Sequence, residues 1–364
     1  MPLTRTPTGS EQPLTLFRTL VHSGKFLPLC LLLGAALFLE SCGGGPTVAT
    51  STGRVLYLGT TSGLFGYSIQ SDNTLKPLSS SALVPGSWNQ IAVTPETPTG
   101  SASPLLLAVA SGTATSISNW TLNSDGTINA AGTAISASCS SFSGHITGIA
   151  AVPGNQYVLA VDGNTTTTDN IVTLPLSPTS GLTCTTASTS SNYPIQPALD
   201  CAVPGSSSSN CILFLTLSST PVSSATPAPP MEKNWSSGAL STLSAPATPY
   251  TCTSSCPLGV AFNSSILYFY ATFYSTTPPS LQSIAPGSAS ATSSTSFSAS
   301  TPLNYPCVDI LGGTTYIPTA NGYLYAVSTG SGGSLGAPGT VLSPGSTGTS
   351  GTLNMTSCAI SSNP

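Results

Sequence analysis

Apolar and polar positions alternate along the chain in a pattern that predicts short β-strands joined by tight turns. In the first copy, an apolar run at 55–58 is followed by a turn of Gly, Thr and Ser and then by a second, mostly apolar run at 64–69. Another turn at 71–74 leads to a third strand that starts at Leu75. The first run is apolar at every position, as expected for a strand with both faces covered by neighbouring sheets.

This unit recurs along the chain with a regular period. A bulky residue and a closing aliphatic residue stand eight positions apart in three copies, Tyr67 to Leu75, Trp120 to Ile128 and Leu174 to Leu182. A short, very apolar strand also recurs, with starts at positions 90, 148, 200, 259 and 308 that are separated by 58, 52, 59 and 49 residues. A period near fifty residues with about four strands is typical of a β-propeller, one blade per period.

The two ends of the chain carry complementary parts of one blade. Residues 353–360 resemble the short apolar strand, with Ser-Cys-Ala-Ile in place of the Asp-Cys-Ala-Val at 200–203, but no partner strands follow them. Residues 55–78 have the partner strands and lack the innermost one. Joining the two ends closes the ring and leaves no free edge. We therefore predict an all-β chain folded as a six- or seven-bladed β-propeller with an N/C-terminal strand clasp.

Charged residues are scarce, at 4% of the chain compared with a usual ~25%. Beyond the first 41 residues the basic side chains are Arg54, Lys76 and Lys233. Such a chain has no surface that neutralises phosphates, so nucleic acid is excluded as a partner. The glycines fall in predicted hairpins and form no phosphate-binding loop or nucleotide fingerprint, so no cofactor is expected.

The N-terminal segment has the features of an export signal. Arg5, Arg18 and Lys25 precede an unbroken apolar run of fourteen residues at 26–39. A membrane-spanning helix needs ~20 apolar residues, whereas a run of this length suits the core of a signal peptide.

Leu39-Glu40-Ser41-Cys42 resembles the lipobox of bacterial lipoproteins. That resemblance implies lipid attachment to Cys42 and cleavage in front of it; Glu40 departs from the small or apolar residue preferred there. The alternative is an ordinary signal peptide with an incidental cysteine. We expect a lipoprotein signal peptide at 1–41, a lipid-anchored linker at 42–53 and the β-propeller at 54–364. The membrane would then be a partner, and the protein would lie in the bacterial cell envelope, facing the periplasm or the exterior.

Eight cysteines remain beyond the lipid site, and an even number in an exported chain favours disulfides over metal ligands. They are Cys139, Cys184, Cys201, Cys211, Cys252, Cys256, Cys307 and Cys358. Eight cysteines allow 105 pairings, so the sequence leaves the connectivity open. Cys201 and Cys211 are the best local pair, because their flanking segments look like neighbouring strands. Cys252 and Cys256 have the wrong spacing for a redox or zinc pair, so a structural bond is favoured there.

Three ionisable residues are the candidates for catalysis. His145 is the single histidine beyond the leader, so any Ser-His-Asp mechanism would use it as the base. Asp200 and Asp309 lie on predicted innermost strands near the channel, where a carboxylate pair could hydrolyse a glycoside. Each has a simpler explanation as well: a hydrogen-bonded loop histidine and two carboxylates that cap turns.

Two further patterns also have both a structural and a functional interpretation. Asp162 and Asp169 flank a loop whose carbonyls could help to ligate calcium, although the spacing of a dedicated calcium loop is missing; otherwise no metal site is predicted. The aromatic run at 268–274 either packs between blades or offers a platform on which sugars stack. The same two interpretations apply to the tryptophans, Trp88, Trp120 and Trp235.

Motifs near the N-terminal end of the repeats carry a family resemblance. Leu-Tyr-Leu-Gly-Thr at 56–60, Phe-Gly-Tyr-Ser-Ile at 65–69 and Ile-Ala-Val-Thr-Pro at 91–95 resemble the lactonase-type β-propeller family, the 6-phosphogluconolactonase-like proteins. The likeness is best over 54–182. It implies a propeller, typically of seven blades, and in some members a lactone-opening activity that uses charged residues near the channel. None of those residues has a counterpart on this chain, so the activity does not carry over.

The sequence therefore favours a lipid-anchored binding or scaffold module for glycan or protein ligands. The alternative is a lactonase-like or glycan-cleaving hydrolase that uses Asp200, Asp309 and His145. The two differ in whether these three residues converge on one concave site.

Overall fold

The computed structural model describes most of the chain from residue 50 onward. The described ranges are 50–94, 104–112, 114–132, 134–136, 145–152, 157–164, 170–176, 185–187, 192–201, 211–221, 226–236, 239–241, 249–252, 255–273, 276–298, 300–345 and 353–361. The chain divides into two compact units, Met1–Ala49 and Thr50–Pro364, and all described residues belong to the second. The leader with Cys42, and also Cys139, Cys184 and Asp169, lie outside the described residues.

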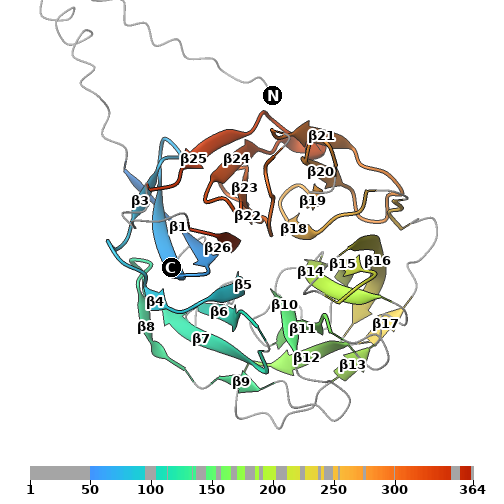
Figure 1. Ribbon diagram of the computed structural model, residues 1–364, viewed down its shortest axis with the longest axis horizontal. Coiled ribbons are helices and arrows are strands. Elements are labelled where there is room, and N and C mark those ends of the chain that lie inside the picture. The colour runs from blue at the N-terminus through green and yellow to red at the C-terminus, as the bar shows by residue number, and fades with distance from the viewer. Residues whose placement is uncertain are drawn as a thin grey trace, which may run out of the picture. The chain divides into compact units, whose positions relative to one another are not determined.

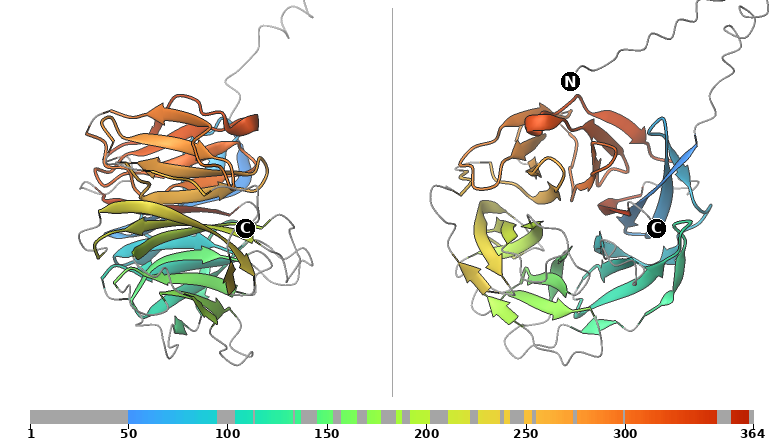
Figure 2. Two further views of the ribbon diagram at one scale, coloured as in Figure 1. Left: turned by 90° about the vertical axis from the view of Figure 1, so that its right-hand side faces the viewer. Right: turned by 180° about the vertical axis from the view of Figure 1, so that it is seen from behind.

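Within the second unit, six antiparallel sheets stand around a common axis as the blades of a β-propeller (Figures 1 and 2). The closing blade has the order β26 (Met355–Ser361), β1 (Ser51–Thr60), β2 (Gly63–Gln70) and β3 (Leu75–Pro77), with β4 (Val84–Pro85) also on β2. The β5 blade consists of β5 (Trp88–Val93), β6 (Leu105–Ala110), β7 (Ser116–Leu122) and β8 (Ile128–Ala131), with β9 (Ile135–Ser136) on β7. The β10 blade consists of β10 (Ile146–Ala151), β11 (Tyr157–Asp162), β12 (Ile171–Pro175) and β13 (Thr185–Ala187).

The other three blades have the same plan. They are the β14 blade, with β14 (Tyr193–Cys201), β15 (Cys211–Ser218), β16 (Pro227–Ser236) and β17 (Ala239–Ser241); the β18 blade, with β18 (Gly259–Asn263), β19 (Tyr268–Phe273), β20 (Ser280–Ile284) and β21 (Ser293–Ser296); and the β22 blade, with β22 (Cys307–Asp309), β23 (Thr314–Pro318), β24 (Leu324–Ser328) and β25 (Gly339–Leu342). A short 3-10 turn, η3 (Ser331–Gly333), lies between β24 and β25. The arrangement is six-bladed, the smaller of the two predicted numbers, and β1 begins three residues before the predicted boundary at 54.

The first and last strands of the chain share one sheet. β1 is antiparallel to β26, with Val55 opposite Ser361 and Leu58 opposite Cys358. In the other five blades the two inner strands follow each other along the chain, whereas here they come from its two ends.

The innermost strands are arranged around the central axis and all run along it in the same direction, which gives the propeller two distinct faces. We call the face where these strands begin the start face and the face where they finish the end face. Because consecutive strands of a blade are antiparallel, turns between first and second strands lie on the end face. Thr50, just ahead of β1, and Ser361, the last residue of β26, also lie on the end face.

Six apolar clusters fill the spaces between blades, one for each pair of neighbours. Strand β1 contributes side chains to two of these clusters, one on each of its faces. Leu56 and Leu58 pack toward the β22 blade, whereas Val55 and Tyr57 pack toward the β5 blade. All four side chains are at most 3% exposed. The prediction that fully apolar strands are covered on both faces is therefore confirmed.

Polar side chains also bridge each pair of neighbouring blades near the start face. At each of the six junctions one side chain donates a hydrogen bond to a backbone oxygen of the next blade: Asn89 Nδ2 to Thr147, Thr147 Oγ1 to Pro194, Thr216 Oγ1 to Leu258, Thr272 Oγ1 to Asn304, Asn304 Nδ2 to Met355 and Thr356 Oγ1 to Trp88. The bridges give these backbone oxygens a side-chain partner, and buried backbone groups need partners. Hydroxyl and amide side chains, rather than charged ones, therefore link neighbouring blades at these positions.

Two turns, 71–74 and 124–127, share the sequence Ser-Asp-x-Thr, and their hydrogen bonds explain why the pattern recurs. Asp72 Oδ1 accepts hydrogen bonds from the Thr74 N–H and hydroxyl, at 3.0 and 2.6 Å. Asp125 and Thr127 repeat the arrangement at 2.9 and 2.6 Å. These hydrogen bonds lower the pKa of both aspartates. The turn is thus a structural motif, which explains why it recurs without implying chemistry.

Candidate functional site

Asp309 ends β22 on the end face, and its carboxylate is paired with Arg54 of the closing blade. Oδ2 accepts from the Arg54 guanidinium, and Oδ1 accepts from the Gly312 N–H at 3.0 Å. The two side chains are 10% and 1% exposed, so the pair is almost withdrawn from water. A Cβ at Gly312 would collide with both partners, so a glycine is required there. Both carboxylate oxygens are occupied, which makes Asp309 a structural residue.

Asp200 has a different environment on β14. Its side chain is buried, and Oδ1 has no hydrogen-bond partner among the residues that the structure describes. Burial raises the pKa of this carboxyl above its ordinary value. An acid that holds its proton at a higher pH than usual is suited to general acid catalysis, so Asp200 is still a candidate catalytic residue.

His145 lies just before β10 on the start face, where it is partly buried. Its backbone N–H donates to Asp162 Oδ2 at 3.4 Å, and Oδ1 of the same carboxylate accepts from the Asn164 N–H at 2.9 Å. Burial raises the pKa of Asp162, and these hydrogen bonds act in the opposite direction. Asp162 thus organises the turn after β11. No group of three His, Cys, Asp or Glu side chains suited to a metal ion occurs in the described part of the chain.

The structure does not bring the three candidate catalytic residues together. Asp200 and Asp309 lie on the end face of blades that the β18 blade separates, whereas His145 lies on the start face. An innermost strand of six residues such as β10 spans roughly 17 Å between the faces. That distance exceeds the reach of proton transfer between side chains, so His145 does not share a site with either carboxylate.

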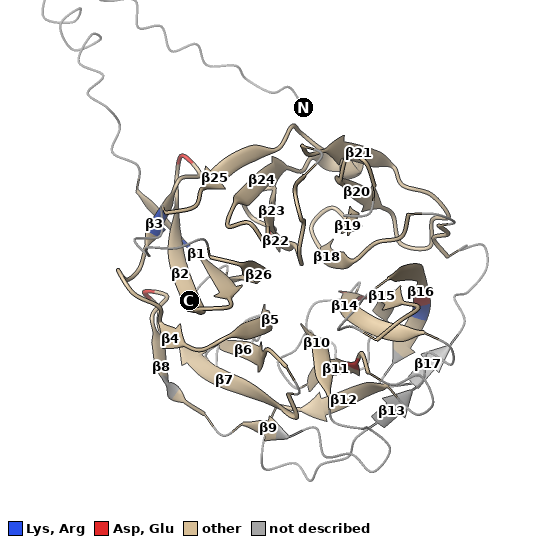
Figure 3. Ribbon diagram, in the orientation of Figure 1, with Lys and Arg blue, Asp and Glu red and all other residues tan. Residues whose placement is uncertain are grey.

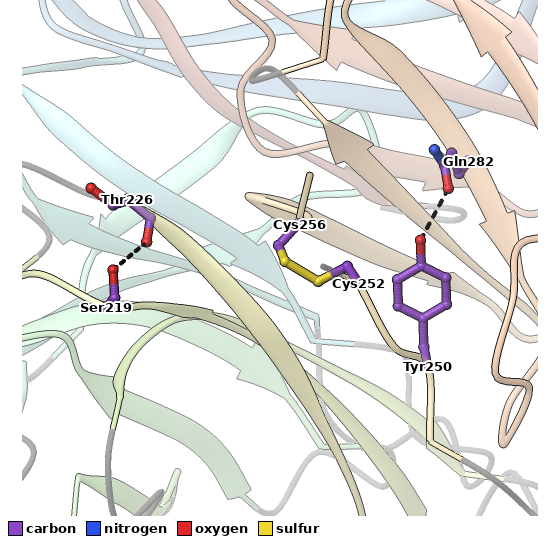
Figure 4. The surroundings of a disulfide bond; sticks show 6 residues. All are labelled: Ser219, Thr226, Tyr250, Cys252, Cys256 and Gln282. Atoms are coloured by element: carbon purple, nitrogen blue, oxygen red, sulfur yellow. Dashed lines mark hydrogen bonds between the residues drawn. A yellow bond between two sulfur atoms is a disulfide. The ribbon is translucent and has the colours of Figure 1, made fainter. Parts of the chain in front are cut away.

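Glu232, on β16, is a buried acid that the sequence did not single out. Its Oε2 accepts from the Tyr250 N–H at 2.9 Å, and burial is the main cause that raises its pKa. Tyr250 in turn donates its hydroxyl to Gln282 Oε1 at 3.2 Å, across to the β18 blade (Figure 4). Strand β16 reads Pro-Ala-Pro-Pro-Met-Glu-Lys-Asn-Trp-Ser, so no local alternation of apolar and polar residues indicated that Glu232 is buried.

The aromatic residues proposed as sugar platforms are buried between blades. The tryptophans Trp88, Trp120 and Trp235 are 7%, 6% and 4% exposed. Trp88 and Trp120 pack edge to face with ring centroids 5.6 Å apart. Phe269, Tyr270 and Phe273 are fully buried. The stacking hypothesis is therefore wrong for these rings, because they belong to the apolar clusters between blades.

Three disulfides are present in the described residues. Cys201–Cys211 links β14 and β15 at a directly opposed pair, as predicted, and Cys252–Cys256 lies beside Tyr250 (Figure 4). Cys307–Cys358 ties β22 to β26, the innermost strands of neighbouring blades. Disulfides of this kind are typical of proteins outside the reducing cytosol, so they support an extracellular or periplasmic location.

Among the described residues there is no helix with the length and apolar character of a membrane span.

Comparison with known proteins shows a shared fold without a family. No protein-family model and no curated protein matches the chain. A chain from a nidogen–laminin complex matches at 11% identity and a TM-score of 0.51, over 85% of this chain and 100% of that chain. Two proteins provisionally named 6-phosphogluconolactonases, from Bacteroides uniformis and Bacteroides fragilis, match at 14% and 11% identity with TM-scores of 0.46 and 0.47. They cover 76% and 85% of this chain and 92% and 98% of their own. Likeness at such identities concerns the fold and carries no activity.

Proposed function

We propose that this protein is an exported, lipid-anchored β-propeller that binds glycan or protein ligands at the cell envelope. The observation that carries the proposal is the separation of its ionisable groups. Asp309 is engaged by Arg54, and His145 lies on the face opposite to Asp200. Few charged residues occur on the described part of the blades (Figure 3). A scaffold whose described histidine lies on the face opposite to Asp200 and whose Asp309 is held in an ion pair is suited to binding.

The start face is the proposed binding surface. Its turns in the closing, β5 and β14 blades expose hydroxyl side chains, among them Ser62, Ser111 and Ser219. The exposed acids of the described residues, Asp72 and Asp125, lie on the end face instead. Hydroxyls both donate and accept hydrogen bonds without bringing charge, which suits an uncharged oligosaccharide better than an ionic ligand.

The lipid anchor would orient this surface. Thr50 lies on the end face, and Cys42 precedes it by eight residues, a reach of at most about 28 Å. A lipid on Cys42 would hold the end face toward the membrane and leave the start face free. We also propose that the pairing of β26 with β1 acts as the clasp that keeps this ring closed.

A hydrolase is the second candidate, and Asp200 is the observation that favours it. Its buried, partly unpartnered carboxyl with a raised pKa is a plausible general acid. Asp200→Asn tests this role, because a hydrolase would lose its turnover of lactones or oligosaccharides while a binding protein would keep its ligand.

Thermal-shift measurement on the protein with and without uncharged oligosaccharides, lactones or calcium tests the binding function. A ligand that binds only the folded state raises the Tm in a concentration-dependent way. We expect an oligosaccharide to do so, and Ser62→Trp or Ser111→Trp on the start face to abolish the shift. Turnover of a lactone that Asp200→Asn eliminates would contradict the proposal.

The lipid anchor is tested separately. Cys42→Ser should move the protein from the membrane fraction to the soluble fraction. If the variant fractionates like the wild type, Cys42 carries no lipid.

A further inference from the structure

Large apolar side chains are exposed at four positions of the described residues, and all four lie on the end face. They are Tyr157, Leu267, Ile310 and Leu311, with exposed fractions of 39%, 51%, 40% and 71%. Each lies at a turn between the first and second strands of its blade. Single exposed apolar residues are common and need no explanation, whereas several that gather on one face can mark an interaction site.

Three of these side chains belong to neighbouring blades. Leu267 is in the turn of the β18 blade, and Ile310 and Leu311 are in the turn of the β22 blade. We call these three residues the apolar rim. The exposed acids Asp72 and Asp125 lie on the same face but on the closing and β5 blades. The end face thus has an apolar sector and an acidic sector.

The apolar rim lies beside the point where the N-terminal segment enters the propeller. Asp309 directly precedes Ile310, and its carboxylate pairs with Arg54, four residues after Thr50. The ion pair therefore holds the loop with the most exposed apolar residue, Leu311, against the strand that the lipid-bearing segment leads into.

The backbone at Leu267, one residue of the apolar rim, is held in an unfavourable conformation. Leu267 has φ +59°, in the left-handed region that leucine rarely adopts. Its N–H nevertheless donates to the Asn263 oxygen at 2.9 Å, which fixes the turn. A glycine or asparagine would be easier to accommodate at such a turn, so the presence of an exposed leucine calls for an explanation outside the fold.

We propose that the apolar rim inserts into the interfacial region of the lipid bilayer and tilts the propeller onto its β18 and β22 blades. This inference rests on the proposed membrane attachment through Cys42. Apolar side chains gain from burial at the headgroup boundary, and a second contact strengthens an anchor. The tilt keeps the acidic sector, on the adjoining closing blade and on the β5 blade, in water, because carboxylates are poorly accommodated by lipid.

Quenching of tryptophan fluorescence by brominated phosphatidylcholine tests the insertion. The native tryptophans are 4% to 7% exposed and give a constant background. Leu311→Trp places a reporter in the apolar rim, and Ser62→Trp places a matched one in an exposed turn of the start face. The protein is held on vesicles by a hexahistidine tag after Pro364 and a nickel-chelating lipid. Attachment is then independent of Cys42, and the tag follows Ser361 on the end face.

We expect the Leu311→Trp signal to fall by at least ~twofold on brominated vesicles and the Ser62→Trp signal to stay unchanged. Adding Leu267→Asp and Ile310→Asp should remove most of the quenching. Equal signals from the two reporters would overturn the insertion, and would leave a protein partner as the occupant of the apolar rim. Cys42→Ser fractionation reports on the lipid independently, so failure of the anchor and failure of the apolar rim are distinguishable.

Discussion

The closing blade and the other five blades connect their two inner strands in different ways. In the β5, β10, β14, β18 and β22 blades, a loop of the chain connects the two inner strands. In the closing blade these strands are β26 and β1, which no loop connects and which pair through backbone hydrogen bonds; we call this pairing the seam. Strand β22 of the neighbouring blade contacts both strands of the seam: the disulfide Cys307–Cys358 holds β26, and the ion pair Asp309–Arg54 holds β1.

The difference shows where a ring of this kind needs reinforcement. All six blade junctions have an apolar cluster and a side-chain bridge to a backbone oxygen, and most of the chain uses no charge for this purpose. A disulfide and a buried ion pair together occur, in the described residues, only next to the seam. The three-residue strand β22 supplies the disulfide from position 307 and the ion pair from position 309, and so stabilises the closing blade.

Removal of residues 353–364 should have the largest effect, because it opens the seam completely. Met355 and Cys358 are 1% and 5% exposed, so the deletion uncovers the apolar cluster between the closing and β22 blades. We expect loss of the cooperative thermal transition, measured by circular dichroism. Removal of 362–364 alone is the control and should leave the Tm unchanged. A truncated chain that still melts cooperatively near the wild-type Tm would show that β26 does not close the ring.

The disulfides offer a matched pair for the next test. Cys307–Cys358 closes a loop with a sequence separation of 51 residues, and Cys201–Cys211 one of 10. Chain entropy alone assigns them about 4 and about 3 kcal/mol of stability. Because the first also holds the seam, we expect Cys307→Ala with Cys358→Ala to lower the free energy of unfolding clearly more than Cys201→Ala with Cys211→Ala. Equal losses in urea unfolding would remove the special role of the seam.

Arg54→Met should cost about 3 kcal/mol, because it leaves the buried Asp309 carboxylate without its partner. Adding Asp309→Asn removes the unpaired charge and should restore part of the loss. Urea unfolding of the single and double variants measures both effects. A single variant as stable as the wild type would show that the pair does not hold β1.

The smallest predicted effect concerns Asp200, far from the seam, and depends on pH. Burial raises the pKa of its carboxyl in the folded state, so the folded chain binds more protons than the unfolded chain between the two pKa values. Stability is then lost as the pH rises through that window and stays constant above it. Asp200→Asn should therefore match the wild type near pH 4 and exceed its Tm by a few degrees at pH 7. A Tm difference that does not grow with pH would show that the carboxyl is not destabilised by burial.

Elements with a local pattern were predictable from the sequence. The fully apolar run at 55–58 indicated a strand covered on both faces, and the recurring short strands indicated blades of about fifty residues. Cys201–Cys211 was predictable because its partners are close in sequence and flank a hairpin.

The candidate site was predictable only in part, since it depends on pairings over long distances. Asp309 and Arg54 are 255 residues apart, and nothing near either one indicates the other. Position on an innermost strand suggested that Asp309 faces the channel, whereas the strand end brings it to the next blade. The rings of Trp88 and Phe269 looked suited to sugars because their types occur at such sites, but the apolar clusters between blades bury them.

Closure of the ring through β26 is the central structural claim, because the position of Thr50 on the end face and the orientation of the start face depend on it. Hydrogen exchange of the intact chain tests it most directly, with the paired strands β14 and β15 as the internal reference. We predict that amides of β26 and β1 at the pair Leu58 and Cys358 exchange as slowly as those at Ala198 and Phe214. Exchange of the β26 amides within minutes, while the reference amides stay protected, would contradict ring closure.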